Sequence, residues 1–400
     1  MMQISLLWAI LLSLIFSPPL LDAHPDNINE QKMLKKLEEY LDGAANGDNF
    51  SGVIIIAKDG QVIFKKAVGY ASKSYNVPNN IDTKFNMASV GKLFTSVAIA
   101  QLAQEGKLSL DDPVSKYLSD WLADNYADEI KIRDLLIHTS GLGNFFDNEK
   151  FKLGDDSGLY IAIEDYKPLV KEEKLAFTPG TSQLYSNTGY LLLGAIIEKI
   201  SGKSYFDYIQ EHIFDPANMM NSGYYEMDDP VPNLAIGFNR TFKDGKPIWK
   251  NNLFENVFKG SPAGGGFSTA GDMLNFYRAL YSNKLLNPEY TRSVLSGEVE
   301  KPKSPVDYIK KEINVLGHNY EVLFTKYGFA GVWNRFGLEI YQSLPLMVGH
   351  SGGLKGVNNN FVIIPDNGYM YILFGNYTGE GTMDPRNKIN EFIIEASKFK

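Results

Sequence analysis

Cysteine is absent from the 400 residues of the chain. Its absence excludes disulfides, thiol catalysis, iron–sulfur clusters and lipid attachment to an N-terminal cysteine. Histidine is scarce, because the chain has only five histidines and no two of them form a close pair such as H-E-x-x-H. We therefore predict neither a metal site nor a bound cofactor.

The chain also lacks any cluster of basic residues. It has 39 Lys and Arg against 47 Asp and Glu, which gives a formal net charge of −8. Scattered basic residues in an acidic chain predict no nucleic-acid partner and no electrostatic attraction to an anionic membrane surface. Hydrophobic residues make up 44% and charged residues 22%, close to globular averages, and no repeat or low-complexity linker interrupts the chain. These totals predict one large folded domain over residues 24–400.

One long apolar run stands at the N-terminus, from Ile4 to Phe16. Two prolines and then Ala23, a small residue suited to cleavage, follow the run, which is too short to span a bilayer comfortably. We predict a signal peptide over residues 1–23, and hence an exported, periplasmic or secreted protein without an integral membrane domain. No Lys or Arg precedes the run and Leu21 is bulky for a cleavage site, so a retained N-terminal anchor stays open.

Strand patterns occur near both ends of the chain, and helical patterns dominate the middle. A helical pattern precedes a hairpin pattern whose turn is Asp59-Gly60. The expected helices cover residues 29–41, 94–102, 190–200 and 389–399, and the expected strands lie within 51–70 and at 346–348, 361–364 and 369–374. This order predicts an α/β (α+β) fold, in which one antiparallel sheet is built from residues 24–88 and 300–400 and a largely helical region over 89–299 is inserted.

The first chemical motif is S-V-G-K at residues 89–92. A serine hydroxyl needs a neighbouring base to become a nucleophile, and at a helix start Lys92 lies on the same face as Ser89. The helix start also offers free backbone N–H groups for a developing oxyanion. A second S-x-x-K sequence occupies residues 397–400, where no pocket can form around the last residues of the chain. We therefore choose Ser89.

The second motif is Tyr185-Ser186-Asn187, directly before a helical pattern. A tyrosine phenol can transfer a proton if nearby cations lower its pKa, and Lys92 is the expected cation. An asparagine amide both donates and accepts, which suits the binding of a substrate amide. The same three letters at residues 281–283 end another helical pattern, where Ser-Asn is a common stop, so we interpret that copy as structural.

The third motif is G-H-S-G-G at residues 349–353. It also fits G-x-S-x-G, the nucleophile elbow of α/β-hydrolases, which requires a helix directly after the serine and a histidine further along the chain. No histidine follows His350, and the residues after Gly353 have a hairpin pattern. The elbow interpretation therefore fails on both counts.

The three motifs in this order resemble the serine β-lactamase and penicillin-binding-protein superfamily, whose elements are S-x-x-K, then S-x-N or Y-x-N, then K-T-G or a variant. The Y-S-N form is most similar to the class C β-lactamase-related branch, which includes DD-peptidases and esterases. The resemblance extends from about residue 50 to residue 374 and includes L-L-I-H-T-S-G-L at 135–142 and A-G-G-G-F-S-T at 263–269. It implies a β-lactamase/transpeptidase-like fold.

The resemblance also implies roles for the motif residues. Ser89 becomes the nucleophile, Lys92 the group that accepts or relays its proton, and Tyr185 the general base and then the acid for the leaving group. The expected substrate-binding residues are Asn187, His350, Ser351 and Gly353, with the backbone N–H groups of Ser89 and Gly353 forming the oxyanion hole.

The chain departs from the family at His350, where lysine is usual and helps to anchor a substrate carboxylate. An unperturbed histidine has a pKa near 6.5, so we expect weak binding of carboxylates at neutral pH and better binding as the pH falls toward 6.

The sequence leaves two classes of function. The favoured one is a serine hydrolase that cleaves an ester or amide through an acyl-enzyme, with a β-lactam, a D-Ala peptide or a short-chain ester as substrate. The alternative is a penicillin-binding module that binds or acylates peptidoglycan-like ligands without efficient turnover. In both, the partner is a small molecule, a peptide or a peptidoglycan fragment. His138 is interpreted as a structural helix-end residue, and the glycines at 264–266 as a wall of the cleft.

Overall fold

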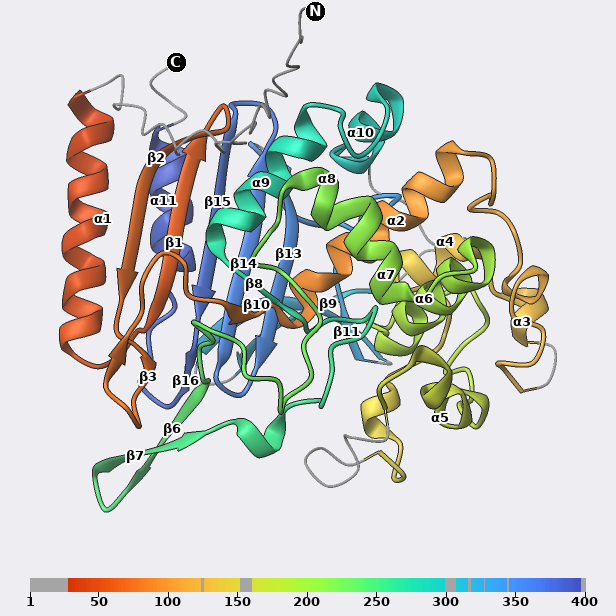
Figure 1. The fold of residues 1–400 in the computed structure, drawn as a ribbon, viewed down its shortest axis with the longest axis horizontal. Coiled ribbons are helices and arrows are strands. Elements are labelled where there is room, and N and C mark those ends of the chain that lie inside the picture. Colours follow the sequence, from red (N-terminus) through yellow and green to blue (C-terminus); the bar gives the residue numbers. More distant parts are fainter. Residues whose placement is uncertain are drawn as a thin grey trace, which may run out of the picture.

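A computed structural model describes residues 28–123, 126–151, 160–298, 307–315, 318–326, 328–343 and 345–396 (Figure 1). The predicted signal peptide and the second S-x-x-K sequence at 397–400 lie outside these residues. Across the described segments, none of the helices has both the length and the apolar character required to cross a membrane.

One six-stranded sheet organises the molecule, and both ends of the chain contribute to it. Every neighbouring pair in the sheet is antiparallel. The strand of this sheet that comes first in the sequence pairs with the one that comes last in the sequence, with Gly52 opposite Gly375. In spatial order the strands are β12 (Glu339–Ser343), β13 (Leu346–Leu354), β14 (Val357–Ile364), β15 (Tyr369–Gly375), β1 (Gly52–Lys58) and β2 (Gln61–Val68).

Helices cover both faces of this sheet (Figure 1). All five residues of the run Val-Ile-Ile-Ile-Ala in β1 are buried. Because alternate residues of a strand point to opposite faces, both faces of the sheet are apolar here and both need a covering layer. Ile54 and Ile56 join the core beneath the two terminal helices, whereas Val53 and Ile55 join the larger core on the other side. The terminal helices are α1 (Ile28–Asn46) and α11 (Arg386–Ala396), and α2 (Lys92–Gln104) and α9 (Ala270–Tyr281) pack on the opposite face.

The helical half of the molecule is arranged around α6 (Asn187–Ser201). The Ser186 side chain caps its start by accepting a hydrogen bond from the Gly189 N–H, and Gly202 ends it with a φ of 70°. α6 packs against α2 and α4, and this packing brings the Y-S-N and S-V-G-K motifs together. The other helices are α3 (Tyr126–Glu129), α4 (Ile132–Leu136), α5 (Lys167–Lys171), α7 (Tyr205–Ile209), α8 (Asp215–Ala217) and α10 (Pro288–Val294).

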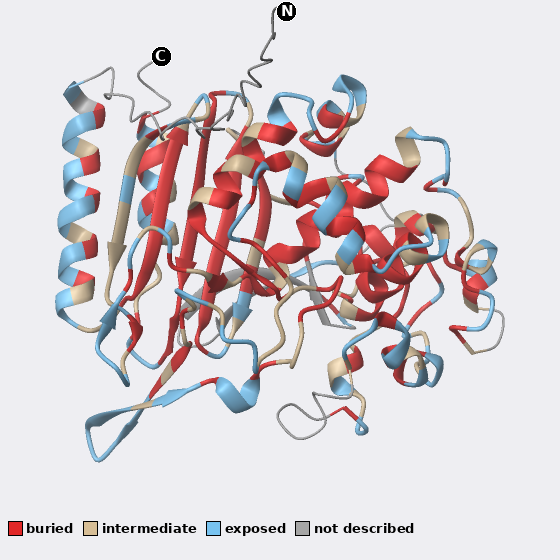
Figure 2. Ribbon diagram, in the orientation of Figure 1, coloured by how far each residue is buried: buried red, intermediate tan, exposed pale blue. Residues whose placement is uncertain are grey.

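The structure also contains strands that the sequence patterns did not predict. A hairpin of β6 (Phe238–Lys243) and β7 (Lys246–Asn251) projects from the molecule with an exposed tip (Figures 1 and 2). Its turn is Asp244-Gly245, both with positive φ, a strong hairpin signal that was present in the sequence. The others are β12 of the central sheet and β3 (Tyr70–Ser72), β4 (Val77–Pro78), β5 (Phe85–Asn86), β8 (Phe267–Ser268), β9 (Ile309–Val315), β10 (His318–Thr325), β11 (Gly328–Ala330) and β16 (Tyr377–Gly379).

Candidate active site

Ser89 lies in a short 3-10 turn, Ala88–Gly91, that leads directly into α2. The residue before it, Ala88, has a φ of 45°, a left-handed conformation that is costly for a residue with a Cβ atom. The Asn86 side chain supports the turn, because its Oδ1 accepts a hydrogen bond from the Ala88 N–H at 2.8 Å. Ser89 keeps part of its surface exposed while Val90 and Lys92 behind it are buried, so the hydroxyl is accessible to a substrate.

Two glycines from distant segments pack against the Ser89 backbone. A Cβ atom on Gly264 would lie 2.6 Å from the Ala88 carbonyl oxygen, and Gly264 itself has a φ of 142°. A Cβ atom on Gly352 would lie 3.2 Å from the Ser89 nitrogen and 2.5 Å from the Met87 carbonyl oxygen. Only glycine fits at these two positions, which bring β13 and the 264–266 loop directly against the Ser89 turn.

Lys92 is fully buried beside Ser89. Its Nζ atom lies 3.4 Å from Ser89 Oγ and donates a hydrogen bond to Asn187 Oδ1 at 2.7 Å. It also donates to the carbonyl oxygen of Ala263, directly before the glycines at 264–266. These glycines were interpreted from their sequence only as a wall of the cleft, and the backbone contact of the residue before them was not predicted.

Burial lowers the pKa of the Lys92 amine well below its usual range, because no carboxylate offsets the loss of hydration. A neutral amine has two N–H donors and one lone pair. The two carbonyl acceptors on Asn187 and Ala263 use both donors. The lone pair is thereby left for the Ser89 hydroxyl, which is the arrangement of a general base and its nucleophile.

Tyr185 completes this cluster from the segment before α6. Its phenol is hydrogen-bonded to the Ser89 hydroxyl, and Lys92 Nζ lies 4.9 Å from the centre of its ring. The expected lowering of its pKa by a Lys92 cation is wrong, because burial raises the pKa of the Tyr185 phenol above its usual range. The phenol is therefore a proton donor in the resting site.

Asn187 is held by a residue that the sequence analysis did not single out. Its Nδ2 atom donates to Asn144 Oδ1 at 3.0 Å, while its Oδ1 accepts from Lys92. These two contacts fix the orientation of the Asn187 amide, and the Asn187 amide in turn positions the Lys92 amine. Asn144 directly follows the L-L-I-H-T-S-G-L fragment and Gly143, so its neighbourhood in the sequence was the only available signal.

His350 lies on β13 and faces the cluster, with its ring centre 6.4 Å from that of Tyr185. It is 2% exposed, and its Nδ1 is 2.6 Å from the Ser351 carbonyl oxygen. Burial lowers the pKa of His350 to about 3. The expectation of better carboxylate binding near pH 6 is therefore wrong, because the imidazole stays neutral throughout that range.

His138 packs under Tyr185 with 4.5 Å between their ring centres. It follows α4 with a φ of 63°, and its Nδ1 accepts a hydrogen bond from the Ser186 N–H at 3.0 Å. Trp333 packs against both His138 and His350, at 4.5 Å and 5.6 Å between ring centres. The imidazole of His138 thus supports the backbone of the Y-S-N motif from behind.

Ser351 and Gly353 lie on the same strand but in different surroundings. Consecutive strand residues point to opposite faces, and the Ser351 hydroxyl donates to Glu339 Oε2 at 3.4 Å rather than joining His350. Gly353 is exposed near the end of β13, one residue after the glycine that packs on the Ser89 nitrogen.

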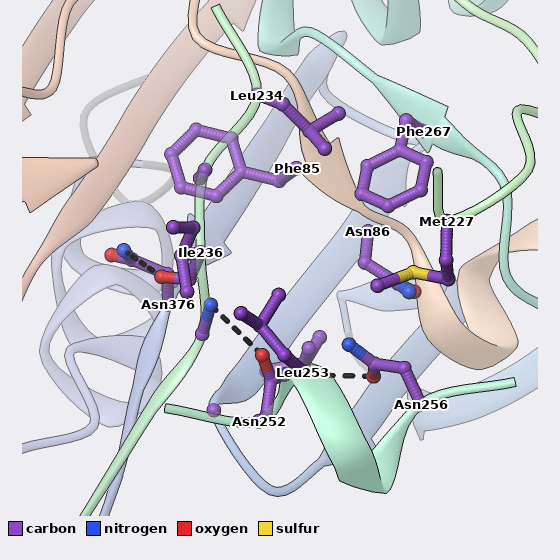
Figure 3. A pocket seen from close by; sticks show the side chains of 15 residues that line it. Phe85, Asn86, Met227, Leu234, Ile236, Asn252, Leu253, Asn256, Phe267 and Asn376 are labelled. Carbon is purple, nitrogen blue, oxygen red and sulfur yellow. Dashed lines mark hydrogen bonds between the residues drawn. The ribbon is translucent and has the colours of Figure 1, made fainter. Parts of the chain in front are cut away.

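A small cavity lies beside Phe85 and Asn86, shortly before the Ser89 turn in the sequence (Figure 3). Its volume is about 30 Å³, room for roughly one water molecule. Asn86 and Phe267 border it on the side of the turn, and Leu253 borders it at the base of the β6–β7 hairpin. Among the residues that the structure describes, no group of three His, Asp or Glu side chains is arranged to hold a metal ion.

Residues 35–396 match the Beta-lactamase family, and the chain belongs to that family. The chain is similar to a protein named as a penicillin-binding protein, PbpX, of Bacillus subtilis (strain 168), with 31% identity over 63% of this chain and 59% of the relative. It is also similar to a teichoic acid D-alanine hydrolase of Staphylococcus aureus (strain MRSA252), with 27% identity over 73% of this chain and 70% of that protein.

Among solved structures, the chain resembles a penicillin-binding protein from Bacillus halodurans, with 26% identity and a TM-score of 0.70. The match covers 92% of this chain and 99% of that one, and it confirms the predicted β-lactamase/transpeptidase-like fold. The chain spans about six tenths of the length of the Bacillus subtilis relative.

Proposed function

We propose that this protein is a serine hydrolase that cleaves an uncharged ester or amide through an acyl-enzyme on Ser89. One observation carries the proposal. The buried Lys92 amine donates to the carbonyl oxygens of Asn187 and Ala263 and lies 3.4 Å from the Ser89 hydroxyl, which in turn is hydrogen-bonded to Tyr185.

In the acylation step, neutral Lys92 takes the proton of the Ser89 hydroxyl as Oγ attacks the substrate carbonyl carbon. The oxyanion that forms is stabilised by the backbone N–H groups of Ser89 and Gly353. When the tetrahedral intermediate collapses, the Tyr185 phenol gives its proton to the leaving oxygen or nitrogen. The resulting phenolate takes the proton held by the Lys92 ammonium, so both groups return to their starting states.

In the deacylation step, water attacks the acyl carbon and the Lys92–Tyr185 pair receives its proton. The proton then passes to Ser89 Oγ as the acyl group leaves as an acid. The raised pKa of Tyr185 supports this division of labour, because a phenol that stays protonated at rest can act as an acid but cannot be the first base.

His350 sets the substrate class in this proposal. A neutral imidazole replaces the cation that anchors a carboxylate in the wider family, and none of the other motif side chains supplies a positive charge. Neutral esters and amides are therefore preferred to substrates with a carboxylate next to the scissile bond. The relative named as a teichoic acid D-alanine hydrolase supports a hydrolytic reaction. We also propose that the enzyme is exported and that peptidoglycan fragments rank below neutral esters as ligands.

The direct test is an assay of the chain without residues 1–23 against a neutral short-chain ester, a D-Ala-terminated peptide and a cephalosporin. We expect kcat/KM to be highest for the ester, by roughly 10- to 100-fold, the worth of one charge-assisted hydrogen bond. Acylation of Ser89 with no turnover of any of the three would contradict the proposal and favour a penicillin-binding module.

Replacing His350 by lysine should raise kcat/KM for the carboxylate-bearing substrates relative to the ester, by about tenfold or more. The wild-type preference should stay constant from pH 5.5 to 8, because His350 has a pKa of about 3 and carries no charge in this range. A His350→Gln variant is the matched control, since it removes the imidazole without adding charge. A wild-type preference that shifts toward carboxylates near pH 6 would show that His350 titrates there.

Replacing Tyr185 by phenylalanine should slow turnover by about 10²–10⁴-fold, because the leaving group loses its proton donor. Esters with a good leaving group, such as a nitrophenolate, should lose least, since they depart without protonation. Tyr281→Phe is the control, because Tyr281 belongs to the other Y-S-N sequence and is 51% exposed at the end of α9. An equal loss in both variants, or an equal loss for all leaving groups, would overturn the role of Tyr185.

A further inference from the structure

Exposed apolar side chains gather at one end of the molecule. Of the thirteen large apolar side chains that are exposed among the described residues, seven belong to the β3–β4 segment or to residues 238–255. The most exposed are Phe254 at 80% and Tyr75 at 78%, and Phe242 is 45% exposed on the projecting hairpin. We call this region, residues 70–78 and 238–255, the basal surface.

The two parts of the basal surface are direct neighbours. Lys73, which follows β3, places its Nζ atom 4.4 Å from the centre of the Trp249 ring on β7 and 4.8 Å from that of Tyr377. β6 pairs with β16, Phe238 opposite Tyr377, which attaches the base of the hairpin to the body. Both segments therefore reach the same side of the molecule, the lower left in Figure 1.

Positive charge accompanies the apolar side chains. Lys243, Lys246 and Lys250 are all exposed on the hairpin, and no ion pair holds any of them among the described residues. Of the two acidic residues between 238 and 255, Asp244 lies in the hairpin turn and Glu255 is paired with Lys355 at 2.8 Å, so the three lysines still outnumber the acidic side chains. The net charge of −8 for the whole chain conceals this local excess, so the expectation of no attraction to an anionic surface does not extend to the hairpin.

The base of the hairpin is rigidly held, so the projection is a built feature of the fold. Arg240 is buried, and its Nη1 donates to the Asp48 carbonyl oxygen and to Asn49 Oδ1, each at 3.0 Å. Its Nε donates to the Glu380 carbonyl oxygen at 2.7 Å. The buried guanidinium anchors the strands. Phe242, the Lys243–Lys246 pair at the turn and Lys250 opposite Asn239 stay exposed.

The basal surface adjoins the active-site strand. Asn252 Nδ2 donates at 2.8 Å to the Lys355 carbonyl oxygen, in the turn that links β13 to β14 just after Gly353. Asn252 and Leu253 also border the small cavity that Asn86 lines (Figure 3). A partner that binds the basal surface would thus lie close to β13, the strand that carries His350.

We propose that the basal surface docks the protein onto an anionic lipid bilayer, independently of the catalytic assignment. Phenylalanine and isoleucine side chains at the tip enter the headgroup region, and the three lysines contact lipid phosphates. The combination of exposed aromatic side chains with unpaired lysines favours a bilayer over a dissolved anionic polymer, which offers phosphate but no apolar layer. The basal surface then holds the protein at the bilayer, while none of the described helices crosses it.

The test is co-sedimentation of the chain without residues 1–23, which retains every described residue, with vesicles of phosphatidylcholine alone or with 30% phosphatidylglycerol. We expect binding to the mixed vesicles that weakens at high salt. The triple variant Lys243→Glu, Lys246→Glu, Lys250→Glu should lose at least roughly 100-fold in affinity, and Phe242→Ser with Phe254→Ser roughly tenfold. Hydrolysis of a soluble ester should be unchanged in both.

The control variant is Tyr281→Ser with Lys284→Glu, which alters one exposed aromatic and one exposed lysine at the end of α9. It should bind the vesicles as the wild type does. Absence of vesicle binding, or an equal loss in the control, would overturn the proposal. So would retention on soluble polyphosphate that depends on the lysines but not on Phe242 and Phe254, because the occupant would then be an anionic polymer.

Discussion

Replacing Ser89 by alanine should abolish covalent labelling and reduce kcat by about 10³- to 10⁶-fold, the range for loss of an enzymatic nucleophile. The variant keeps Lys92, Tyr185 and the glycine contacts around the turn, so its fold should persist and its substrate affinity should change little. A fluorophosphonate probe, followed by mass spectrometry of the digested protein, should add mass to the peptide that contains Ser89 and to no other peptide.

The matched control is Ser351→Ala, which removes the serine of the G-H-S-G-G motif. Its hydroxyl donates to Glu339 Oε2, away from the Lys92 amine that faces Ser89, so we expect labelling to be retained. Labelling at Ser351, or survival of labelling in Ser89→Ala, would restore the nucleophile-elbow interpretation of residues 349–353. Circular dichroism of both variants would separate loss of the nucleophile from loss of the fold.

Replacing Lys92 by alanine should reduce turnover by about 10²–10⁴-fold, because the Ser89 hydroxyl loses its base. In the wild type, burial holds the pKa of the amine well below its usual range, which favours the neutral form that can act as a base. As the pH falls through that lowered pKa, the amine takes a proton and kcat/KM falls, which gives the profile an acid limb. The residual activity of Lys92→Ala should lack that limb.

The double variant Ser89→Ala, Lys92→Ala separates this role from a general structural effect. Residues that act as one unit give non-additive losses, so the double variant should be no slower than Ser89→Ala alone. Additive losses would mean that Lys92 acts independently of Ser89. An unchanged acid limb in Lys92→Ala would assign that titration to a different group.

The sequence was sufficient for the fold because the elements that define it have strong local signals. The apolar β1 run, the Asp59-Gly60 turn and the Ser186 and Gly202 caps of α6 each specify one element through local chemistry. Asp244-Gly245 is a strong turn signal, yet the β6–β7 hairpin was not predicted. Its strands are mostly polar and lack the alternation of apolar residues that identifies a half-buried strand.

The structure brings Ser89, Lys92, Tyr185 and Asn187 into direct contact, as the order of the motifs predicted, although their roles await the experiments above. The protonation states were not predictable, because burial depends on tertiary packing. His350 and Tyr185 have ordinary pKa values as free side chains, and burial in the folded protein is the largest cause of the shift in each. The contacts of Lys92 with the Ala263 carbonyl and of Asn187 with Asn144 also depend on tertiary packing, because each joins segments that are distant in the sequence. They were therefore not predictable from the motifs.

The pairing of β1 with β15 also constrains how the chain folds. Gly52 and Gly375 are neighbours in the sheet, so more than three hundred residues of loop must close before β1 has both of its partners. Contacts of such long range slow folding, because the chain loses the entropy of loop closure before the free energy of the contacts can offset that loss. Until then the Val-Ile-Ile-Ile-Ala run of β1 has a free edge, which can pair with another chain and promote aggregation of a nascent or truncated protein.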